Sequence, residues 1–440
     1  MRSAGLDADR TGRAPPVAGF VDVLRLGGAM LGELARHRGK ASMRRAVRGW
    51  SERTSVRLGN ADFVLKVGSK RLLLVGGLEL SRCVLAPRPG TDGLVAGNIK
   101  QKAMATLAPK ALTISDGDDW TRRRAFNEFV LDSGHLHSLA PMIAAAARTA
   151  FREPITNVES IRDAMRRTML AVDFGEGVAP DHIAADLEYL SGLVQNPLRR
   201  MLLGPFAGGR RRRLRSAIAT MWASAESGPA SLLKRAREAP PLGDDEVLEQ
   251  VPHWMFTFLG SATDLLAHAL WLALSHEPTR TALVAEIASA GESLSSLDGL
   301  PLLNGCLLEA AQLYPTTNRT FHHTTQAVTL GATVVPANVE IVHWFPLLQP
   351  AQPVAPSFRP RRWADGHTTS DEPFDPFLGG SRACPGKHLI LFVCKVAMAE
   401  LLVSRPVALA CAALDVYALP MELPAGLPRF APRTPHQVPT

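Results

Sequence analysis

The stretch FLGGSRACPG, residues 377–386, constrains the fold of this chain more than any other. Its cysteine, Cys384, follows two glycines and Arg382, and it precedes Pro385, which suits the first position of a helix. A helix is therefore predicted to begin at Pro385, and its positive end favours the thiolate of Cys384 over the thiol. The glycines permit tight turns, and Phe377 can exclude water. Arg382 is placed to neutralise an anion beside a metal.

A thiolate on haem iron, with a propionate paired to an arginine, requires all of these features together. Two alternatives use the same cysteine. One is an ordinary buried cysteine at a junction between a loop and a helix. The other is a zinc site made of Cys384, His388 and Cys394, but the sequence offers no second cluster at ligand spacing. The spacing F-x-x-G-x-R-x-C-x-G before a helix favours the haem ligand.

The whole chain, residues 1–440, is expected to fold as a single domain that is mainly α-helical with a small β-rich part. Its composition, 46% hydrophobic and 20% charged, suits a large packed core. A hairpin is predicted over 63–75 and a β-rich region over 322–345. The ends, about 1–16 and 424–440, are expected to be disordered. Helices are predicted over 77–85, 118–131, 135–150, 160–174, 182–200, 210–226, 245–276, 278–290 and 300–313.

The net charge and the cysteine content give no indication of a nucleic-acid-binding protein or of a disulfide-rich secreted protein. A net charge of +8 over 440 residues is mild and does not indicate a nucleic-acid partner. Five scattered cysteines form no disulfide framework, which favours a reducing, cytoplasmic location. The first residues lack a secretory signal. The apolar stretch 254–274 contains Thr263, Asp264 and His268, so we expect a buried core helix and no transmembrane anchor.

Further motifs occur in a fixed order around the cysteine stretch. DDWTRRR contains the pattern W-x-x-x-R, FLGSATD lies within the predicted long central helix, and LLEAAQLYP and FRPRRW come before the cysteine. With these motifs the chain resembles the cytochrome P-450 family of haem-thiolate enzymes, of the soluble bacterial type, over most of its length. The most specific motif comprises Phe377, Gly380, Arg382, Cys384 and Gly386.

The resemblance implies a cytochrome P-450 fold that binds haem b between the central helix and the helix after the cysteine. Cys384 is the implied axial ligand of the iron, and Phe377 and Gly386 border the haem on the thiolate side. Gly260 and Thr263 are implied to form the groove on the oxygen side. The implied partners of the haem propionates are Trp120, Arg124, Arg319 and Arg382.

Two departures from the family pattern stand out. The helix that usually carries E-x-x-R has Glu309 but Gln312, so one cation is missing. The remaining pair, Glu309 with Arg362 of FRPRRW, is charge-balanced and is expected to support the cysteine loop. In the central helix, Ala262 occupies the place of the usual acid before Thr263. A threonine in a helix commonly bonds back to a carbonyl, so its role on the oxygen side depends on the motif.

Three functions remain open on these residues. The leading one is a monooxygenase that activates dioxygen to oxidise a small apolar metabolite, in secondary metabolism. The second is haem-thiolate chemistry of another type, such as peroxide use, dehydration, rearrangement or ring formation. The third is a low-activity, cytochrome-like activator protein. The absence of flavin and nicotinamide fingerprints predicts ferredoxin and ferredoxin reductase as separate electron donors.

Two groups of basic residues suggest contacts with a partner protein or a membrane. Arg122, Arg123 and Lys387 are candidate contacts for an acidic electron donor. The run GGRRRRLR, residues 208–215, could touch an anionic membrane surface, but it also fits the solvated start of a helix.

Overall fold

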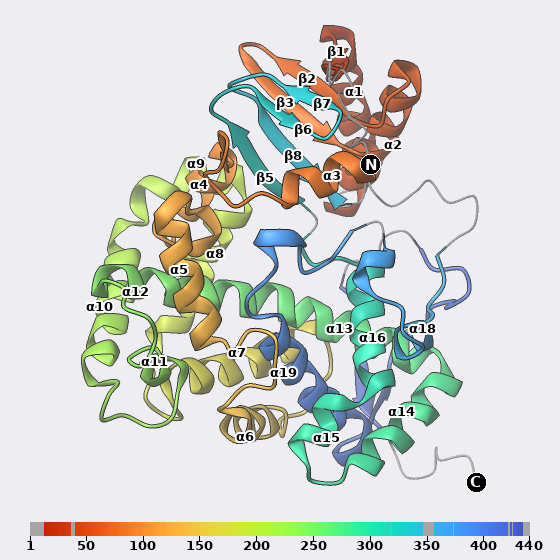
Figure 1. The fold of residues 1–440 in the computed structure, drawn as a ribbon. Helices are drawn as coiled ribbons and strands as arrows, with labels where there is room; N and C mark the ends of the chain where they lie inside the picture. Colours follow the sequence, from red (N-terminus) through yellow and green to blue (C-terminus); the bar gives the residue numbers. More distant parts are fainter. Residues whose placement is uncertain are drawn as a thin grey trace, which may run out of the picture. The chain divides into compact units, whose positions relative to one another are not determined.

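The computed structural model describes residues 13–36, 40–317, 319–345, 356–372, 374–420, 423–424 and 426–433 (Figure 1). It divides into two compact units. The first comprises Met1–Asn98, Asn318–Pro350 and Gly379–Arg382, and the second comprises the remainder. The expected chain ends lie partly outside the described residues. Within the range 424–440, Phe430–Pro432 form strand β10, which pairs with β9, Val407–Leu409.

The first unit contains the main sheet, with strand order β1-β2-β3-β8-β5-β4. The predicted hairpin is confirmed as β2 and β3, joined antiparallel, and β3 runs parallel to β8 from the predicted β-rich region. Helices α1, α2 and α3 belong to the same unit. The strands are β1 Val17–Ala18, β2 Phe63–Val67, β3 Lys70–Val75, β4 Leu94–Ala96, β5 Arg319–Thr324 and β8 Glu340–Trp344, with β6 Val328–Leu330 and β7 Thr333–Val335 as a separate pair. The helices are α1 Phe20–Arg36, α2 Lys40–Leu58 and α3 Leu78–Leu85.

The second unit is almost entirely helical, which confirms the predicted fold class. Its helices share one large hydrophobic core, and the predicted helices are all represented. Its first helices are α5 Gly117–Val130, α6 Ala140–Ala150, α7 Val158–Phe174, α8 His182–Gln195, α9 Pro197–Leu203, α10 Gly208–Ser224 and α11 Leu232–Arg235. The later ones are α12 Asp244–Thr257, α13 Thr263–Ser275, α14 Glu277–Ala290, α15 Leu294–Gly299, α16 Pro301–Leu313, α18 Arg361–Ala364 and α19 Lys387–Ala399, while α4 Asn98–Met104 crosses the boundary between units.

Two predicted helices differ from the observed ones for local reasons. The prediction of one helix over 182–200 is wrong, because Pro197 cannot donate a backbone hydrogen bond and starts a new helix. Asn196 caps that new helix through a bond from Arg199 N, 3.0 Å long. The helix after the cysteine begins at Lys387 rather than at Pro385, because residues 385–386 form a turn.

The long central helix is confirmed, with one irregularity. Three acidic residues in the first turn of α12 favour its start, and the helix passes through a π-helical segment, Phe258–Ala262, into α13. The whole stretch, Asp244–Ser275, is the one helix of the described chain that is long and apolar enough to cross a membrane. However, 67% of its most apolar window is buried inside the protein, as expected of a core helix.

Candidate functional site

The cysteine loop is closed by its own backbone. Cys384 N donates to Phe377 O over 2.8 Å, and Phe377 N donates to Asp375 Oδ1 over 2.8 Å. Leu378 adopts φ +63°, a left-handed conformation that is costly for a branched residue. Lys387 Nζ lies 5.3 Å from the centre of the Phe377 ring, a cation–π contact. These contacts fix the conformation of the loop at both of its ends, and Cys384 lies at the end that bonds to Phe377.

The electrostatics of Cys384 differ from the prediction made from the helix end alone. Burial raises the pKa of the Cys384 thiol, and a hydrogen bond from the Gly386 N–H and the charges of Arg124 and Lys387 lower it less than burial raises it. The helix begins three residues after the cysteine, which weakens the expected effect of its dipole. A bound metal cation reverses this balance, because coordination deprotonates a thiol outright.

Two of the predicted propionate residues lie on α5 in the second unit. Trp120 and Arg124 are one turn apart and share a face of the helix. Arg124 donates through Nη1 to the carbonyl oxygen of Ala383, the residue before the cysteine, and through Nε to Glu128. The structure thus brings Arg124 to the cysteine loop, and Trp120 is buried on the same helix.

The other two predicted propionate residues belong to the first unit. Arg319 begins β5, with its guanidinium 6.0 Å from the centre of the Phe321 ring. Arg382 ends a short 3-10 turn that starts at Gly380. Gly380 has φ +61°, and a Cβ atom there would lie 2.6 Å from Leu85 O, so only glycine fits.

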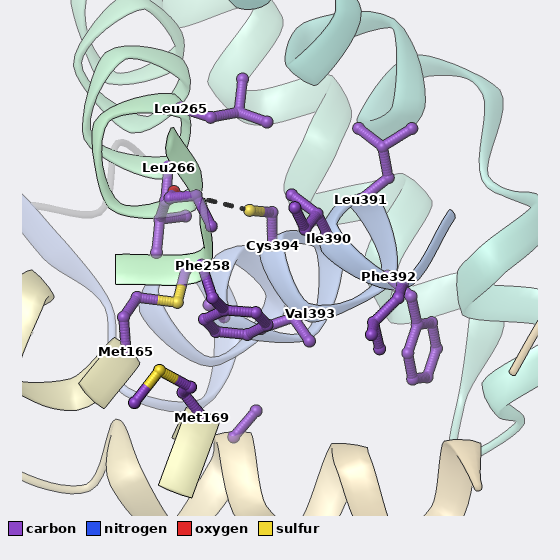
Figure 2. Packing of buried hydrophobic residues seen from close by; sticks show 14 of the residues in the cluster. Met165, Met169, Phe258, Leu265, Leu266, Ile390, Leu391, Phe392, Val393 and Cys394 are labelled. Atoms are coloured by element: carbon purple, nitrogen blue, oxygen red, sulfur yellow. Dashed lines mark hydrogen bonds between the residues drawn. The ribbon is translucent and has the colours of Figure 1, made fainter. Parts of the chain in front are cut away.

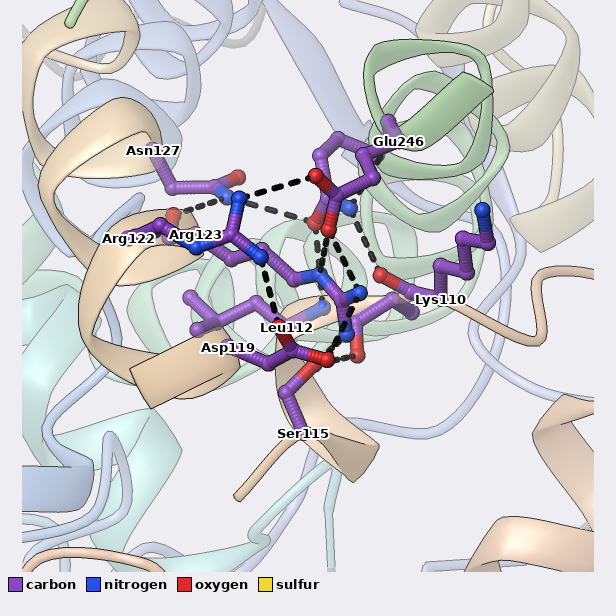
Figure 3. A network of polar contacts seen from close by, with 10 residues as sticks. Lys110, Leu112, Ser115, Asp119, Arg122, Arg123, Asn127 and Glu246 are labelled. Carbon is purple, nitrogen blue, oxygen red and sulfur yellow. Dashed lines mark hydrogen bonds and ion pairs between the residues drawn. The ribbon is translucent and has the colours of Figure 1, made fainter. Parts of the chain in front are cut away.

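A buried polar network fastens α5 to α12 (Figure 3). Arg123 donates to Glu246 through Nε and Nη2, at 2.9 and 2.6 Å, and to Ser115 Oγ at 2.7 Å. Gln250 Oε1 accepts from Leu112 N at 3.0 Å and from Asn127 Nδ2 at 3.3 Å. We call this set the α5–α12 clasp. It positions the helix that carries Trp120 and Arg124.

The clasp corrects one prediction and adds residues that sequence reasoning missed. Arg123 was a candidate contact for an electron donor, but it is only 7% exposed and its charge is matched by Glu246. Arg122 is exposed, yet it is also paired, with Asp119 and Glu246. Gln250 was missed because its partners, Leu112 and Asn127, lie far from it in the sequence, and only the fold brings them together.

The π-helical segment of the central helix presents Thr263 in an unusual state. Its side chain is fully buried, and Oγ1 has no hydrogen-bond partner among the residues the structure describes. Other helical threonines bond back to their own helix, as Thr168 does to Ala164 O and Thr257 does to His253 O. The commonplace role weighed for Thr263 from the sequence is therefore wrong. π-bulges of this kind are frequent at functional sites.

The same segment packs against the helix that follows the cysteine (Figure 2). Cys394 Sγ on α19 lies 3.9 Å from Ala262 O, within reach of a weak hydrogen bond. Phe258 and Val393 belong to the same buried cluster. Gly260, in the middle of the segment, is open: a Cβ atom there would find only Gln195 Nε2, at 3.8 Å. The helix bearing Gly260 and Thr263 and the helix after Cys384 are thus neighbours.

The ion pair between Glu309 and Arg362, which was expected to support the cysteine loop, is present. Arg362 donates to Glu309 Oε2 through Nε at 2.8 Å, and its Nη2 lies 2.7 Å from the same oxygen, which confirms the predicted pair. Glu309 also accepts from Arg359 N at 3.0 Å and Trp363 Nε1 at 2.6 Å. Arg362 makes a second ion pair, with Glu372. Gln312 is buried on the same helix, α16.

These residues fit an iron porphyrin and not a zinc ion. The described part of the chain has no group of three or more His, Cys, Asp and Glu side chains able to hold a metal ion. His388 Nδ1 accepts from Gly134 N at 3.0 Å, and Cys394 contacts Ala262 O, so both are engaged elsewhere. A lone thiolate suits an iron whose other ligands come from the porphyrin. The unshared hydroxyl of Thr263 suits the other side of that group.

Comparisons with known proteins point to one family. Residues 231–404 match the family model for Cytochrome P450. The chain is 26% identical over 192 residues to probable cytochrome P450 4d20 of Drosophila melanogaster, covering 39% of this chain and 36% of the relative. It is 31% identical over 152 residues to cytochrome P450 monooxygenase tpcB of Cochliobolus heterostrophus, covering 31% of this chain and 30% of the relative. The matched segments thus span about a third of each relative.

The fold extends the likeness to the whole chain. A solved structure of the cyanobacterial CYP120A1 with retinoic acid bound superposes with a TM-score of 0.70. The match covers 96% of this chain and 100% of the other at 17% identity, so it establishes the shared fold alone. The cysteine loop, the family match over residues 231–404 and the fold agree: the chain is similar to the cytochrome P450 family, which binds haem b, and shares its fold.

Proposed function

We propose that this protein is a haem-thiolate monooxygenase that oxidises a small apolar metabolite, in secondary metabolism. When bound, haem b supplies the redox-active iron at which dioxygen is reduced with two electrons from a donor protein. In this proposal Cys384 would ligate the haem iron through its thiolate, and Phe377 and Gly386 would lie beside the haem on the thiolate side. Trp120, Arg124, Arg319 and Arg382 hold the propionates.

One observation carries the proposal: the buried, unshared hydroxyl of Thr263 at a π-bulge. A hydroxyl in an apolar site without a partner costs about 1–3 kcal/mol, so its presence there calls for a function. Its Oγ1 can orient a water molecule and pass a proton toward the oxygen side, which proton-dependent cleavage of dioxygen requires. Gly260, one turn earlier, leaves the space in which a substrate and that water would meet.

A second candidate function rests on Ala262. The residue before Thr263 is fully buried and carries no carboxylate, so the usual acid is missing from the proton path. Asp264 follows Thr263, about 100° further around the helix. The missing carboxylate suits chemistry that needs no proton from this position. Examples are peroxide use, dehydration, rearrangement and ring formation. The activator alternative is less favoured, because a scaffold would not need Cys384.

The remaining parts of the proposal concern partners and location. We propose ferredoxin and ferredoxin reductase as the electron donors, in the cytoplasm of a bacterium. Lys387 and the exposed Arg122 remain candidate contacts for an acidic donor, although Arg122 is partly neutralised by its two acids. No nucleic acid takes part in this proposal.

Two experiments test the proposal. Cys384→Ala is expected to abolish the absorbance band that gives the family its name, recorded on the reduced protein with carbon monoxide. Cys411→Ser, at another free cysteine, is the matched control and should keep the band. A band that survives Cys384→Ala would exclude this cysteine as the ligand.

Turnover with NADPH, ferredoxin and ferredoxin reductase is then compared with turnover driven by hydrogen peroxide, over a panel of apolar metabolites. Substrates are first selected by the change they cause in the absorbance of the oxidised haem protein. Faster product formation with the redox chain supports the monooxygenase. Product formed with peroxide alone supports the second candidate, and substrate binding without turnover under either condition supports an activator.

A further inference from the structure

Trp344, the last residue of β8, has a buried indole N–H that lacks an acceptor. Its side chain is 7% exposed, and Nε1 has no hydrogen-bond partner among the residues the structure describes. An indole nitrogen can only donate, and a buried tryptophan usually finds an acceptor for it. A buried donor without an acceptor is destabilising, so this position calls for an acceptor that the described residues do not supply.

The other tryptophans show that this state is exceptional. Of the seven in the chain, five donate through Nε1 to an oxygen of another described residue. Within the described part of the chain, Trp344 and Trp120 are the two without such a bond. Trp120 is the tryptophan for which the sequence motif implies contact with a haem propionate. The five acceptors are Asp22 O for Trp50, Asp244 Oδ1 for Trp222, Asn127 Oδ1 for Trp254, Ala412 O for Trp271 and Glu309 Oε2 for Trp363.

The strand register places Trp344 beside Arg319. In the antiparallel pair of β5 and β8, these two residues lie directly opposite each other. Side chains of directly opposite residues project from the same face of a sheet, with their Cβ atoms about 4.5–5.5 Å apart. Arg319 is exposed at the start of β5. A guanidinium and a buried indole N–H are therefore neighbours on one face, and both belong to the first unit.

The acid that β8 contributes to this face is engaged elsewhere. The next opposite pair on the face is Phe321 with Val342, and both are apolar. The pair after that is His323 with Glu340, and the carboxylate of Glu340 lies 3.4 Å from His323 Nδ1. Glu340 also accepts from Asn98 N at 3.2 Å. The acceptor for the indole must therefore come from a bound group, and the neighbouring guanidinium favours an anion.

We propose that Trp344 holds a haem propionate together with Arg319. The indole N–H donates to a carboxylate oxygen, and the guanidinium pairs with the same group. A hydrogen bond to a charged acceptor is roughly twice as strong as a neutral one, so bound haem compensates the buried donor. The assignment rests on the haem of the proposed function and adds a residue outside the motifs that carry the resemblance.

A carboxylate on the substrate would offer the indole the same chemistry. The haem is the favoured source, because its two carboxylates are present in every molecule of the holoprotein, whereas the proposed substrate is apolar. The experiments below distinguish the two sources.

Transfer of haem from the holoprotein to an excess of apomyoglobin tests the assignment. Trp344→Phe keeps an aromatic ring and removes the N–H, so haem should leave roughly tenfold faster or more. Trp50→Phe is the matched control, because it removes the N–H of another buried tryptophan of the same unit, which donates to Asp22 O over 2.8 Å. The control should release haem at the wild-type rate. A folded Trp344→Phe protein isolated without haem, beside a loaded Trp50→Phe protein, would be the strongest form of this result.

Two spectroscopic measurements on the holoprotein report the propionate itself. The bending vibration of a haem propionate depends on its hydrogen bonds, so its resonance Raman band should shift in Trp344→Phe and stay in place in Trp50→Phe. The reduction potential of the haem iron should fall in Trp344→Phe, because a carboxylate that loses a donor stabilises the ferric state more strongly. A loss of packing alone would not move the propionate band.

Three outcomes would overturn the assignment. The first is a Trp344→Phe protein with the haem release rate and propionate band of the wild type. The second is faster release from Trp344→Phe and Trp50→Phe alike with an unmoved band, which would make Trp344 a packing residue only. The third is unchanged haem release with weaker binding of metabolites that carry a carboxylate, which would assign the indole to the substrate. All three require a haem-loaded wild type, whereas a wild type that binds no haem would contradict the proposed function itself.

Discussion

At the scale of single residues, Thr263 is the side chain whose state is hardest to explain by folding alone. Its hydroxyl is fully buried and finds no partner among the described residues, although it could have bonded back to its helix as Thr168 does. The backbone widens into a π-helix immediately before it. Thr263 thus departs from the rule that a buried hydroxyl forms a hydrogen bond, and such departures tend to mark functional sites.

Replacement of this threonine by valine is expected to stabilise the fold and impair coupling. Thr263→Val keeps the shape and removes an unshared buried hydroxyl, so the free energy of unfolding should rise by roughly 1 kcal/mol. The fraction of consumed NADPH recovered as product should fall, since the proton-handling group is lost. Both are measured on the holoprotein, by thermal melting and by product analysis.

Thr168→Val is the matched control for that change. Its hydroxyl donates to Ala164 O over 2.9 Å, so its loss should lower the free energy of unfolding by about 1 kcal/mol and leave coupling intact. If Thr263→Val destabilised the protein as Thr168→Val does, the hydroxyl would have a partner and the argument for its role would fail.

At the scale of elements, the α5–α12 clasp joins two helices that carry different parts of the site. α5 bears Trp120 and Arg124, and α12 leads into the π-helical segment before Thr263. The ion pair between Arg123 and Glu246 is nearly excluded from water, with side chains 8% and 13% exposed. Breaking such a pair from one side is costly, because it leaves a buried charge without its partner.

Glu246→Gln is expected to lower the free energy of unfolding by about 2–4 kcal/mol in chemical denaturation at neutral pH. Glu159→Gln, in an exposed pair with Arg162, should change it by less than about 0.5 kcal/mol. Equal losses in the two variants would mean that Arg123 finds adequate compensation from Asp119, and the clasp would not be the fastening inferred.

The same pair has a pH dependence of known sign. Burial opposes ionisation of Glu246, yet the hydrogen bonds and charges of Arg123 and Arg122 lower its pKa overall. A lowered folded-state pKa stabilises the protein above the unfolded value, about 4.3, and this contribution is lost as the pH falls through the folded value. The stability difference between wild type and Glu246→Gln should therefore shrink in acid.

At the scale of the whole molecule, one buried acid opposes stability at neutral pH. Asp173, near the end of α7, is 4% exposed, and Oδ2 has no hydrogen-bond partner among the residues described. Burial raises the pKa of Asp173 well above its ordinary value. The folded state therefore holds a proton that the unfolded chain releases, and its stability falls as the pH rises above about 4.

Asp173→Asn is expected to relieve this penalty. The melting temperature should exceed that of the wild type at pH 8, and the gain should shrink toward pH 4, because asparagine does not titrate. Each pKa unit corresponds to about 1.4 kcal/mol. Asp163→Asn on the same helix is the control: its exposed pair with Arg166 predicts no gain that grows with pH. A gain for Asp173→Asn that is constant from pH 4 to 8 would contradict this account.

The sequence by itself determined most of the helices and strands. Periodic apolar residues predicted the helices, because each buries one face, and the turn before Lys70 predicted the β2–β3 hairpin. The spacing around Cys384 predicted the loop, because glycines such as Gly380 act within a short segment. The Glu309–Arg362 pair joins two segments 53 residues apart, and it was predicted from the motifs that contain the two residues. Two helix boundaries were predicted wrongly. The predicted helix 182–200 is interrupted at Pro197, and α19 begins at Lys387 and not at Pro385.

Only the tertiary structure decided which side chains are buried and which are paired, because their partners lie far away in the sequence. Arg123 reads as a surface cation until Glu246, 123 residues away, buries and neutralises it. The sequence left open whether the Thr263 hydroxyl bonds back to its own helix, and only the packed structure shows that it has no partner among the described residues. Burial and pairing are properties of the packed chain, because segments far apart in sequence supply both sides of each contact.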